Sequence, residues 1–364
     1  MSQKTRVLVA DDSPFVCRLL TSYLQSAAEF EVVGTAFDGQ EALAKAKALR
    51  PDALTLDLEM PGMDGLEALA QIMRECPTPV VAVSGVSGRA AARTLQALDL
   101  GAVDFVLKYA VGANIHPAEL CREVLAKVRA ASRIRVVRSL SSRTGTTHRN
   151  AAAAPREPRP PDPEAEAGLV VIGASTGGPL ALRELLSRLP ADMGAGIVVV
   201  QHMSRDFTPV LAAQLDRHCH LGVREGQDGD RVQPGTVLVA PGGSHLLLRP
   251  GFRVAVHAGS RAGGYCPSID AAMESAARIY GSRTVGVLLT GMGDDGARGM
   301  QAIHEKGGTT FVQDSESCVV EGMPERARER AAVDGVAPPA EIARLLIKEL
   351  ERRAQSCGTR PSGG

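Results

Sequence analysis

Three features are missing from this sequence of 364 residues: a net charge, a long apolar run and paired cysteines. Lys plus Arg and Asp plus Glu both number 41, so no positive excess draws the chain to nucleic acid or to an anionic membrane. No apolar run is long enough to span a membrane, and Val7–Ala10 is too short for the core of a secretory signal. The seven cysteines contain no Cys-x-x-Cys pair, which is typical of reduced thiols. We therefore expect a cytoplasmic protein that binds no nucleic acid and is not inserted in a membrane.

The length predicts about two domains, because one domain usually takes roughly 100–200 residues. The composition, 44% hydrophobic and 23% charged, is that of a soluble globular chain, so both domains are expected to fold. Only residues 139–167 depart from it, as a run of Ser, Thr, Arg, Ala and Pro that is typical of a flexible linker. We expect domains at 1–138 and 168–352, and a disordered tail at 353–364.

The first domain alternates apolar, β-rich runs with segments of helical spacing. Five such repeats predict an α/β fold with a five-stranded, doubly wound parallel sheet. The strands are expected at Val7–Ala10, Val32–Ala36, Ala53–Leu58, Val80–Ser84 and Asp104–Leu107. The helices are expected at Phe15–Gln25, Gly39–Leu49, Gly65–Arg74, Arg89–Leu98 and from Pro117 onward. Ligands of such sheets bind at the carboxyl ends of the strands.

Acidic residues end two of these strands. Asp11, Asp12 and Asp57 would meet at one sheet edge, where like charges are costly unless a cation such as Mg²⁺ neutralises them. Carboxylates at strand ends also occur as helix caps. Ser84 and Lys108 close two further strands with a hydroxyl and an ammonium group that suit a phosphoryl group.

Residues 4–133 resemble the receiver domain of two-component response regulators, most specifically in Leu-Asp-Leu-Glu-Met-Pro-Gly-Met-Asp-Gly at 56–65. The resemblance implies that a chemotaxis histidine kinase is the phosphodonor and that Asp57 accepts the phosphoryl group. It also implies a magnesium site and a set of residues that respond to phosphorylation. The implied metal ligands are Asp11, Asp12, Asp57 and the carbonyl of Glu59, and the implied switch residues are Ser84, Phe105 and Lys108.

The second domain repeats the alternation and predicts a doubly wound, Rossmann-like α/β fold. Its segment Gly-Ala-Ser-Thr-Gly-Gly at 173–178 lies between a strand and a helix. Three interpretations stay open at this point: a phosphate-binding turn, a nucleophile elbow that exposes Ser175, and a tight turn that needs small residues. The strands are expected at Leu169–Ile172, Ile197–Val200, Thr236–Ala240 and Val285–Leu289, and a last helix at Pro339–Arg352.

Two further strand ends favour the nucleophile. His202 follows the strand that ends at Val200, and the pair Asp294-Asp295 follows the strand at 285–289. A serine needs an imidazole to take its proton and a carboxylate to orient that imidazole. The chain order Ser, His, Asp differs from the order Ser, Asp, His of α/β-hydrolases, so that fold is not implied. His245 is the less plausible base, and His218 and His220 are expected at the surface.

Residues 168–352 are similar to the catalytic domain of chemotaxis protein-glutamate methylesterases, the CheB family. Carried over by motif, the resemblance implies Ser175 as nucleophile, His202 as base and Asp295 as the carboxylate that orients the base. The choice of Asp295 over Asp294 rests on the resemblance, because residue chemistry does not distinguish the two. It implies ester hydrolysis on methyl-accepting chemoreceptors without a cofactor, and glutamine deamidation as a second activity. The candidate oxyanion donors are the backbone N–H groups near Thr176 and Met292. The matching motifs are Gly-Ala-Ser-Thr-Gly-Gly, Gln-His-Met (201–203), Ala-Pro-Gly-Gly-Ser-His (240–245), Pro-Ser-Ile-Asp (267–270), Thr-Gly-Met-Gly-Asp-Asp-Gly (290–296) and Ser-Cys-Val-Val-Glu-Gly-Met-Pro (317–324).

Two positions depart from the family patterns. Tyr109 follows Lys108 where receivers usually have a proline, and Cys266 stands where the methylesterases often have an arginine. A cis bond before a non-proline residue costs about 3–4 kcal/mol, so the loop at Tyr109 is expected to run trans. The linker is long enough for the receiver to pack across the Ser175 cleft and for phosphorylation to release it. A transcription factor, a nucleotide-binding module and a pure adaptor are the alternatives for the whole chain.

Overall fold

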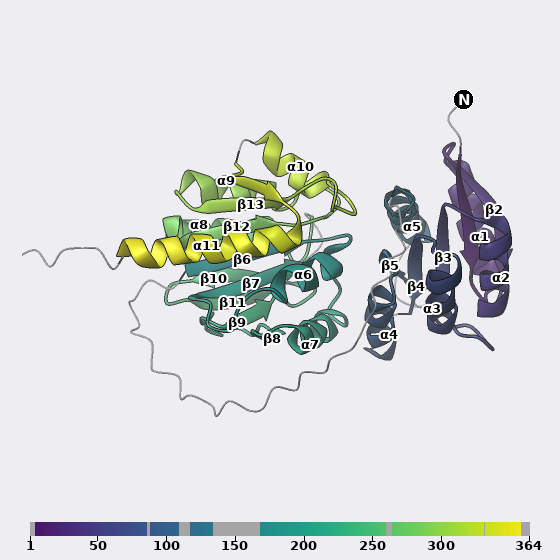
Figure 1. Cartoon of the computed structure of the whole chain (residues 1–364), viewed down its shortest axis with the longest axis horizontal. Coiled ribbons are helices and arrows are strands. Elements are labelled where there is room, and N and C mark those ends of the chain that lie inside the picture. Colours follow the sequence, from purple (N-terminus) through teal and green to yellow (C-terminus); the bar gives the residue numbers. More distant parts are fainter. Residues whose placement is uncertain are drawn as a thin grey trace, which may run out of the picture.

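The computed structural model describes residues 4–85, 88–108, 117–133, 168–259, 264–330 and 332–357. The expected linker at 139–167 and the expectation for Tyr109 lie outside these ranges. The described chain forms two α/β units that stand side by side in Figure 1.

The first unit is a five-stranded parallel sheet in the order β2-β1-β3-β4-β5. Helices α1 and α5 pack on one face and α2, α3 and α4 on the other, so the predicted doubly wound sheet is confirmed. Its strands are β1 (Thr5–Ala10), β2 (Phe30–Ala36), β3 (Ala53–Asp57), β4 (Val80–Ser84) and β5 (Asp104–Leu107). Its helices are α1 (Pro14–Ser26), α2 (Gly39–Leu49), α3 (Gly65–Glu75), α4 (Gly88–Asp99) and α5 (Pro117–Ala131).

The second unit is a seven-stranded parallel sheet in the order β14-β13-β12-β6-β7-β9-β8. The four expected strands are present, and the sequence interpretation missed the others. The strands of the sheet are β6 (Gly168–Ala174), β7 (Ala195–Gln201), β8 (Gly222–Glu225), β9 (Thr236–Val239), β12 (Thr284–Leu288), β13 (Thr309–Gln313) and β14 (Gly335–Ala337). A separate antiparallel hairpin pairs β10 (Ser244–Arg249) with β11 (Arg253–Ala258).

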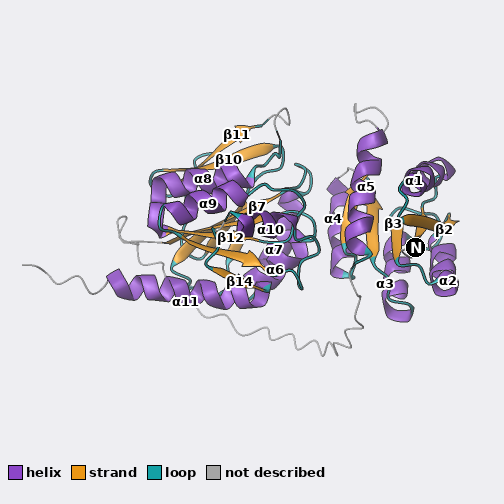
Figure 2. Cartoon of the chain, turned by 90° about the horizontal axis from the view of Figure 1, so that it is seen from above, coloured by secondary structure: helices purple, strands orange, loops and turns teal. Residues whose placement is uncertain are grey.

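Helices cover both faces of this second sheet (Figure 2). They are α6 (Gly178–Leu186), α7 (Thr208–His218), α8 (Ile269–Tyr280), α9 (Ala297–Glu305), α10 (Gly322–Glu329) and α11 (Pro339–Cys357), with a short 3-10 helix at Gly281–Arg283. The last helix continues to Cys357 instead of ending at Arg352, because Glu349 bonds Arg352 and Arg353 across one helical turn. The start of the tail expected at 353 is therefore helical.

The strand order places the site. The first strand of the unit, β6, lies between β7 and β12, so the chain winds outward in both directions from it. Ala174 pairs with Gln201 of β7, and Gly173 pairs with Leu288 of β12. The residues that follow these three strands therefore meet at one sheet edge, at the switch point where open α/β sheets bind ligands.

The two units contact each other through α4 and β5 of the first and α7 of the second. The side-chain amide of Gln214 on α7 donates to Asp99 of α4 at 2.6 Å, and Asp99 also pairs with Arg183 of α6. Phe105 of β5 stacks on Phe207, with 5.2 Å between ring centroids and 9° between planes. In the described part of the chain, no helix combines the length and the apolar character needed to cross a bilayer.

Candidate active site

The carboxyl edge of the first sheet gathers the predicted acidic group. Asp11 and Asp57 are buried and Asp12 is exposed, and one carboxylate oxygen of each lies within 4.8 Å of the others. Lys108 Nζ lies 2.6 Å from Asp11 Oδ2 and 2.7 Å from Asp57 Oδ2. Carboxylate oxygens at this spacing fit a hard divalent cation such as Mg²⁺.

Burial raises the pKa of Asp57 to about 6, although Lys108 and the N–H of Glu59 act in the opposite direction. Burial also raises the pKa of Asp11. The pKa of Lys108 is raised, because its two carboxylate neighbours outweigh the effect of its own burial. The ammonium of Lys108 therefore lies beside the carboxylates of Asp11 and Asp57, and burial disfavours the ionised form of both.

The expected switch residues Ser84 and Phe105 lie on β4 and β5, one and two strands away from Asp57. Ser84 is fully buried at the end of β4. The ring of Phe105 lies at the contact between the two units, 5.1 Å from the ammonium of Lys127. For Glu59, the backbone N–H donates to Asp57 Oδ1 at 3.1 Å, which holds the loop around this carboxylate.

The carboxyl edge of the second sheet gathers Ser175, His202 and Asp295. Ser175 directly follows β6 and His202 directly follows β7, after the paired residues Ala174 and Gln201. Neighbouring parallel strands lie about 4.8 Å apart, so the two residues are neighbours across the sheet edge. Asp295 comes from the loop after β12, and its Oδ2 lies 2.8 Å from Nε2 of His202.

The imidazole orientation follows from this bond. Nε2 faces the carboxylate, whereas Nδ1 is buried and, among the described residues, has no hydrogen-bond partner. A neutral imidazole that donates its Nε2 proton to Asp295 keeps the lone pair on Nδ1. The atom of His202 that can accept a proton is therefore Nδ1.

Asp295 accepts four hydrogen bonds. Besides His202, the donors are the hydroxyl of Ser268 at 3.1 Å and the backbone N–H groups of Ile269 at 2.7 Å and Asp270 at 2.9 Å. Burial acts to raise the pKa of Asp295, but His202 and these N–H groups at the start of α8 outweigh it, so the pKa is lowered. Asp294, by contrast, is exposed.

The oxyanion candidates were predicted from the glycine-rich turns. Thr176 is buried and Met292 is 48% exposed. The N–H of Ser175 is already used, since it donates to the carbonyl of Thr290 at 3.0 Å. No backbone hydrogen bond of a turn or loop in the described ranges uses the N–H of Thr176 or of Met292.

The sequence interpretation missed several supporting residues. Gln201 donates from Nε2 to the carbonyls of Ser175 at 2.9 Å and His202 at 3.2 Å, which ties the two loops together. Tyr265 stacks on the ring of His202, with 4.5 Å between centroids and 4° between planes. No sequence signal marked Tyr265, but Gln201 belongs to the Gln-His-Met motif and was available as a candidate.

The remaining histidines and Cys266 take no part in the hydrogen bonds of Asp295 and His202 described above. His245 lies on the β10–β11 hairpin, paired with His257. Asp11, Asp12 and Asp57 form the only group of metal-binding side chains within the described ranges, so His218 and His220 have no such partners there. Cys266 lies beside His245, because a Cβ built on Gly259 would be 2.3 Å from its Sγ and 2.8 Å from His245 Nε2.

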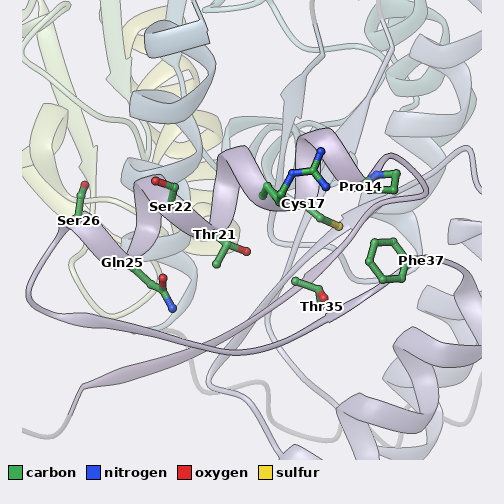
Figure 3. Close-up of a pocket in the computed structure, with 9 residues that line it drawn as sticks. Pro14, Cys17, Thr21, Ser22, Gln25, Ser26, Thr35 and Phe37 are labelled. Atoms are coloured by element: carbon green, nitrogen blue, oxygen red, sulfur yellow. The ribbon is translucent and has the colours of Figure 1, made fainter.

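A separate hollow of about 520 Å³ runs along α1 (Figure 3). Its lining includes Thr21, Ser22 and Phe37, and its one thiol is Cys17. Burial raises the pKa of Cys17 to about 11, so the thiol is protonated and unreactive at neutral pH. This hollow is therefore not a second nucleophilic centre.

The fold and the two sites together define a receiver joined to an α/β unit with a serine-hydrolase arrangement. The response regulator receiver family matches residues 7–118 and the CheB methylesterase family matches residues 170–346. The chain belongs to the CheB family.

Relatives align over almost the whole length. A protein-glutamate methylesterase/protein-glutamine glutaminase 1 of Geobacter metallireducens is 43% identical, over 96% of this chain and 97% of that protein. A protein-glutamate methylesterase/protein-glutamine glutaminase of Bordetella pertussis is 44% identical, over 96% of this chain and 99% of that protein. The crystal structure of the Thermotoga maritima CheB methylesterase catalytic domain is 41% identical, covers 50% of this chain and 98% of its own, and has a TM-score of 0.49.

Proposed function

We propose that this chain is a cytoplasmic, phosphorylation-controlled esterase that removes methyl groups from glutamate side chains of bacterial chemoreceptors. The observation that carries the proposal is the Asp295–His202 bond of 2.8 Å beside a serine that follows the neighbouring strand. The names of relatives that align over almost the whole chain support the substrate.

The proposed reaction is acyl transfer. Ser175 Oγ attacks the γ-carbonyl carbon of the ester while Nδ1 of His202 takes the hydroxyl proton. The tetrahedral intermediate expels methanol, which leaves with that proton, and an acyl-serine remains. Water then attacks the acyl group with His202 as base again, which frees the glutamate carboxyl group and restores the serine.

Asp295 keeps the proton of the imidazole on Nε2 and stabilises the imidazolium that forms in each step. Negative charge on the carbonyl oxygen would be met by the N–H groups of Thr176 and Met292, each of which is worth about 10²–10³ in rate by analogy with other hydrolases. The same machinery releases ammonia from a glutamine side chain, so we also propose deamidation. No step of this scheme uses a cofactor.

Phosphorylation is proposed to act through Asp57. Asp11, Asp12 and Asp57 would hold Mg²⁺, which neutralises phosphoryl oxygens during transfer from a histidine-kinase donor. Lys108, between Asp11 and Asp57, would then bind one of the phosphoryl oxygens.

The contact between the units supports control by occlusion. A cavity of about 320 Å³ between them is lined by Phe105 and Lys127 of the receiver and by His202 and Tyr265. A receptor helix cannot reach the site while the receiver occupies this position. A rearrangement at Lys108 and Phe105 on phosphorylation would weaken the packing on Phe207, and a tenfold activation requires only about 1.4 kcal/mol.

The test is methanol release from receptor membranes labelled in their methyl esters. Wild-type chain given a phosphodonor and Mg²⁺ should release methanol, and the Ser175→Ala variant should release none. Membranes that carry receptors with alanine in place of the methylated glutamates are the matched control. No release by the wild-type chain from the methylated membranes would contradict the proposed substrate.

A further inference from the structure

Tyr265 lies against the proposed base without any role in the scheme above. Its ring covers the imidazole of His202 almost in parallel, with 4.5 Å between centroids. The tyrosine is 41% exposed, whereas the side chain of His202 is only 13% exposed. Tyr265 therefore shields one face of the imidazole from water.

The position of Tyr265 is fixed at both ends. Its hydroxyl group lies against the loop that carries Asp294 and Asp295. A Cβ built on Gly293 would lie 1.9 Å from this hydroxyl oxygen, so the glycine leaves the space that the tyrosine fills. Three residues further along, Ser268 donates to Asp295. One short segment thus contacts both the imidazole and its carboxylate partner.

The chemistry of the base gives this stacking a consequence. His202 becomes a cation each time it takes the serine proton, and the face of an aromatic ring attracts a cation. Stacking also restricts rotation of the imidazole, which must keep Nε2 toward Asp295 for Nδ1 to act. The attraction to the cation is larger in the transition state than in the resting enzyme, so it raises the rate. The restricted rotation acts earlier, because it holds the imidazole in the reactive orientation before the reaction begins.

We propose that Tyr265 is a positioning residue whose ring holds the imidazole of His202 against Asp295 and stabilises its protonated form. The inference rests on the proposed function only in taking His202 as the base. It assigns the role to the ring face and not to the hydroxyl group, which lies beside Gly293 of a neighbouring loop.

The test compares Tyr265→Phe with Tyr265→Leu in the full chain, saturated with phosphodonor and Mg²⁺. Leucine fills much of the space and keeps water off the imidazole, but it has no aromatic face. The readout is the rate at which a fluorophosphonate probe labels Ser175, followed across pH, because this reaction needs the base and no receptor. The thermal midpoint of each variant is measured in parallel to exclude unfolding.

The charged and titratable groups around His202 are constant across these variants, apart from residue 265 itself. They are Asp294 and Asp295 on the loop after β12, Cys266 beside the tyrosine, and Glu123 and Lys127 of α5 on the far side of the cavity. A difference in pH dependence between the leucine and phenylalanine variants therefore reports the ring.

We expect Tyr265→Leu to label roughly 5–30-fold more slowly, with the acid limb of its pH profile moved down by about half a unit or more. Tyr265→Phe should lose less than about threefold and keep the wild-type limb. Equal defects in both variants, or a leucine variant with wild-type rate and limb, would overturn the role of the ring. Wild-type chain that is not labelled would overturn the triad and this inference together. Labelling without methanol release would overturn only the proposed substrate.

Discussion

Replacement of Asp295 by asparagine should change both the reaction rate and the thermal midpoint, because the carboxylate accepts four hydrogen bonds. Oδ2 accepts from His202 at 2.8 Å and from Ile269 N at 2.7 Å, and Oδ1 accepts from Ser268 at 3.1 Å and from Asp270 N at 2.9 Å. An amide has only one acceptor oxygen, so its NH₂ group must face donors wherever it is placed. Each placement has a different consequence for the site.

With NH₂ in the place of Oδ2, His202 must accept at Nε2, and the proton moves to Nδ1, where it blocks the base. With NH₂ in the place of Oδ1, the N–H of Asp270 at the start of α8 is left unpaired, which costs about 1–3 kcal/mol. The first placement predicts a loss of roughly 10⁴ in rate, as seen when a triad carboxylate becomes an amide elsewhere. Both placements predict a thermal midpoint lower by about 2–12 °C, because the first leaves the N–H of Ile269 unpaired in the same way.

The assay is methanol release by Asp295→Asn under phosphorylating conditions, with Asp294→Asn as the matched control. Asp294 is exposed one residue away, so its amide variant should retain most of the activity and its thermal midpoint. Asp295→Asn that keeps both the wild-type rate and the wild-type thermal midpoint would refute the proposed hydrogen bonds of Asp295.

Three further predictions concern the nucleophile, the phosphorylation site and the contact between the units. Ser175→Ala and His202→Ala should each abolish methanol release while the thermal midpoint stays within a few degrees, because both residues lie in loops at the strand ends. Full activity in either variant would show that the replaced residue does not belong to the triad. Acetyl phosphate with Mg²⁺ should label the wild-type chain but not Asp57→Ala, and a chelator should suppress the labelling. Labelling of Asp57→Ala at the wild-type stoichiometry would contradict this assignment. Asp99→Ala removes the acceptor of Gln214 and the partner of Arg183, so unphosphorylated activity should rise several-fold toward the phosphorylated level, and unchanged activity would show that this contact does not restrain the enzyme.

The parallel strands of both sheets were predictable because their signal is local. Val80–Ser84 is a continuous apolar run that ends in a polar residue, and Ala53–Asp57 is the same apart from Thr55. This pattern is typical of a strand buried on both faces. The same rule located Asp57, Ser84, Ser175 and His202 at strand ends. Knowledge of the strand order was not needed, because all carboxyl ends of a parallel sheet share one edge.

The short edge strands were not predictable in the same way. Strands β8 and β14 have only four and three residues, and they are defined by pairing with a neighbour rather than by their own composition. The stacking of Tyr265 on His202 joins residues 63 positions apart through a loop, so no spacing rule reveals it. The choice of Asp295 over Asp294 likewise depends on which carboxylate the loop turns inward, and the buried one is Asp295.

Phosphorylation of Asp57 is expected to control an ester hydrolase centred on Ser175. The most direct measurement is the rate of methanol release from methylated receptor membranes by one preparation, with and without acetyl phosphate and Mg²⁺, beside Asp57→Ala. The phosphodonor should raise the wild-type rate at least several-fold and leave the basal rate of Asp57→Ala unchanged. Equal stimulation of both proteins, or release that continues undiminished in Ser175→Ala, would contradict it.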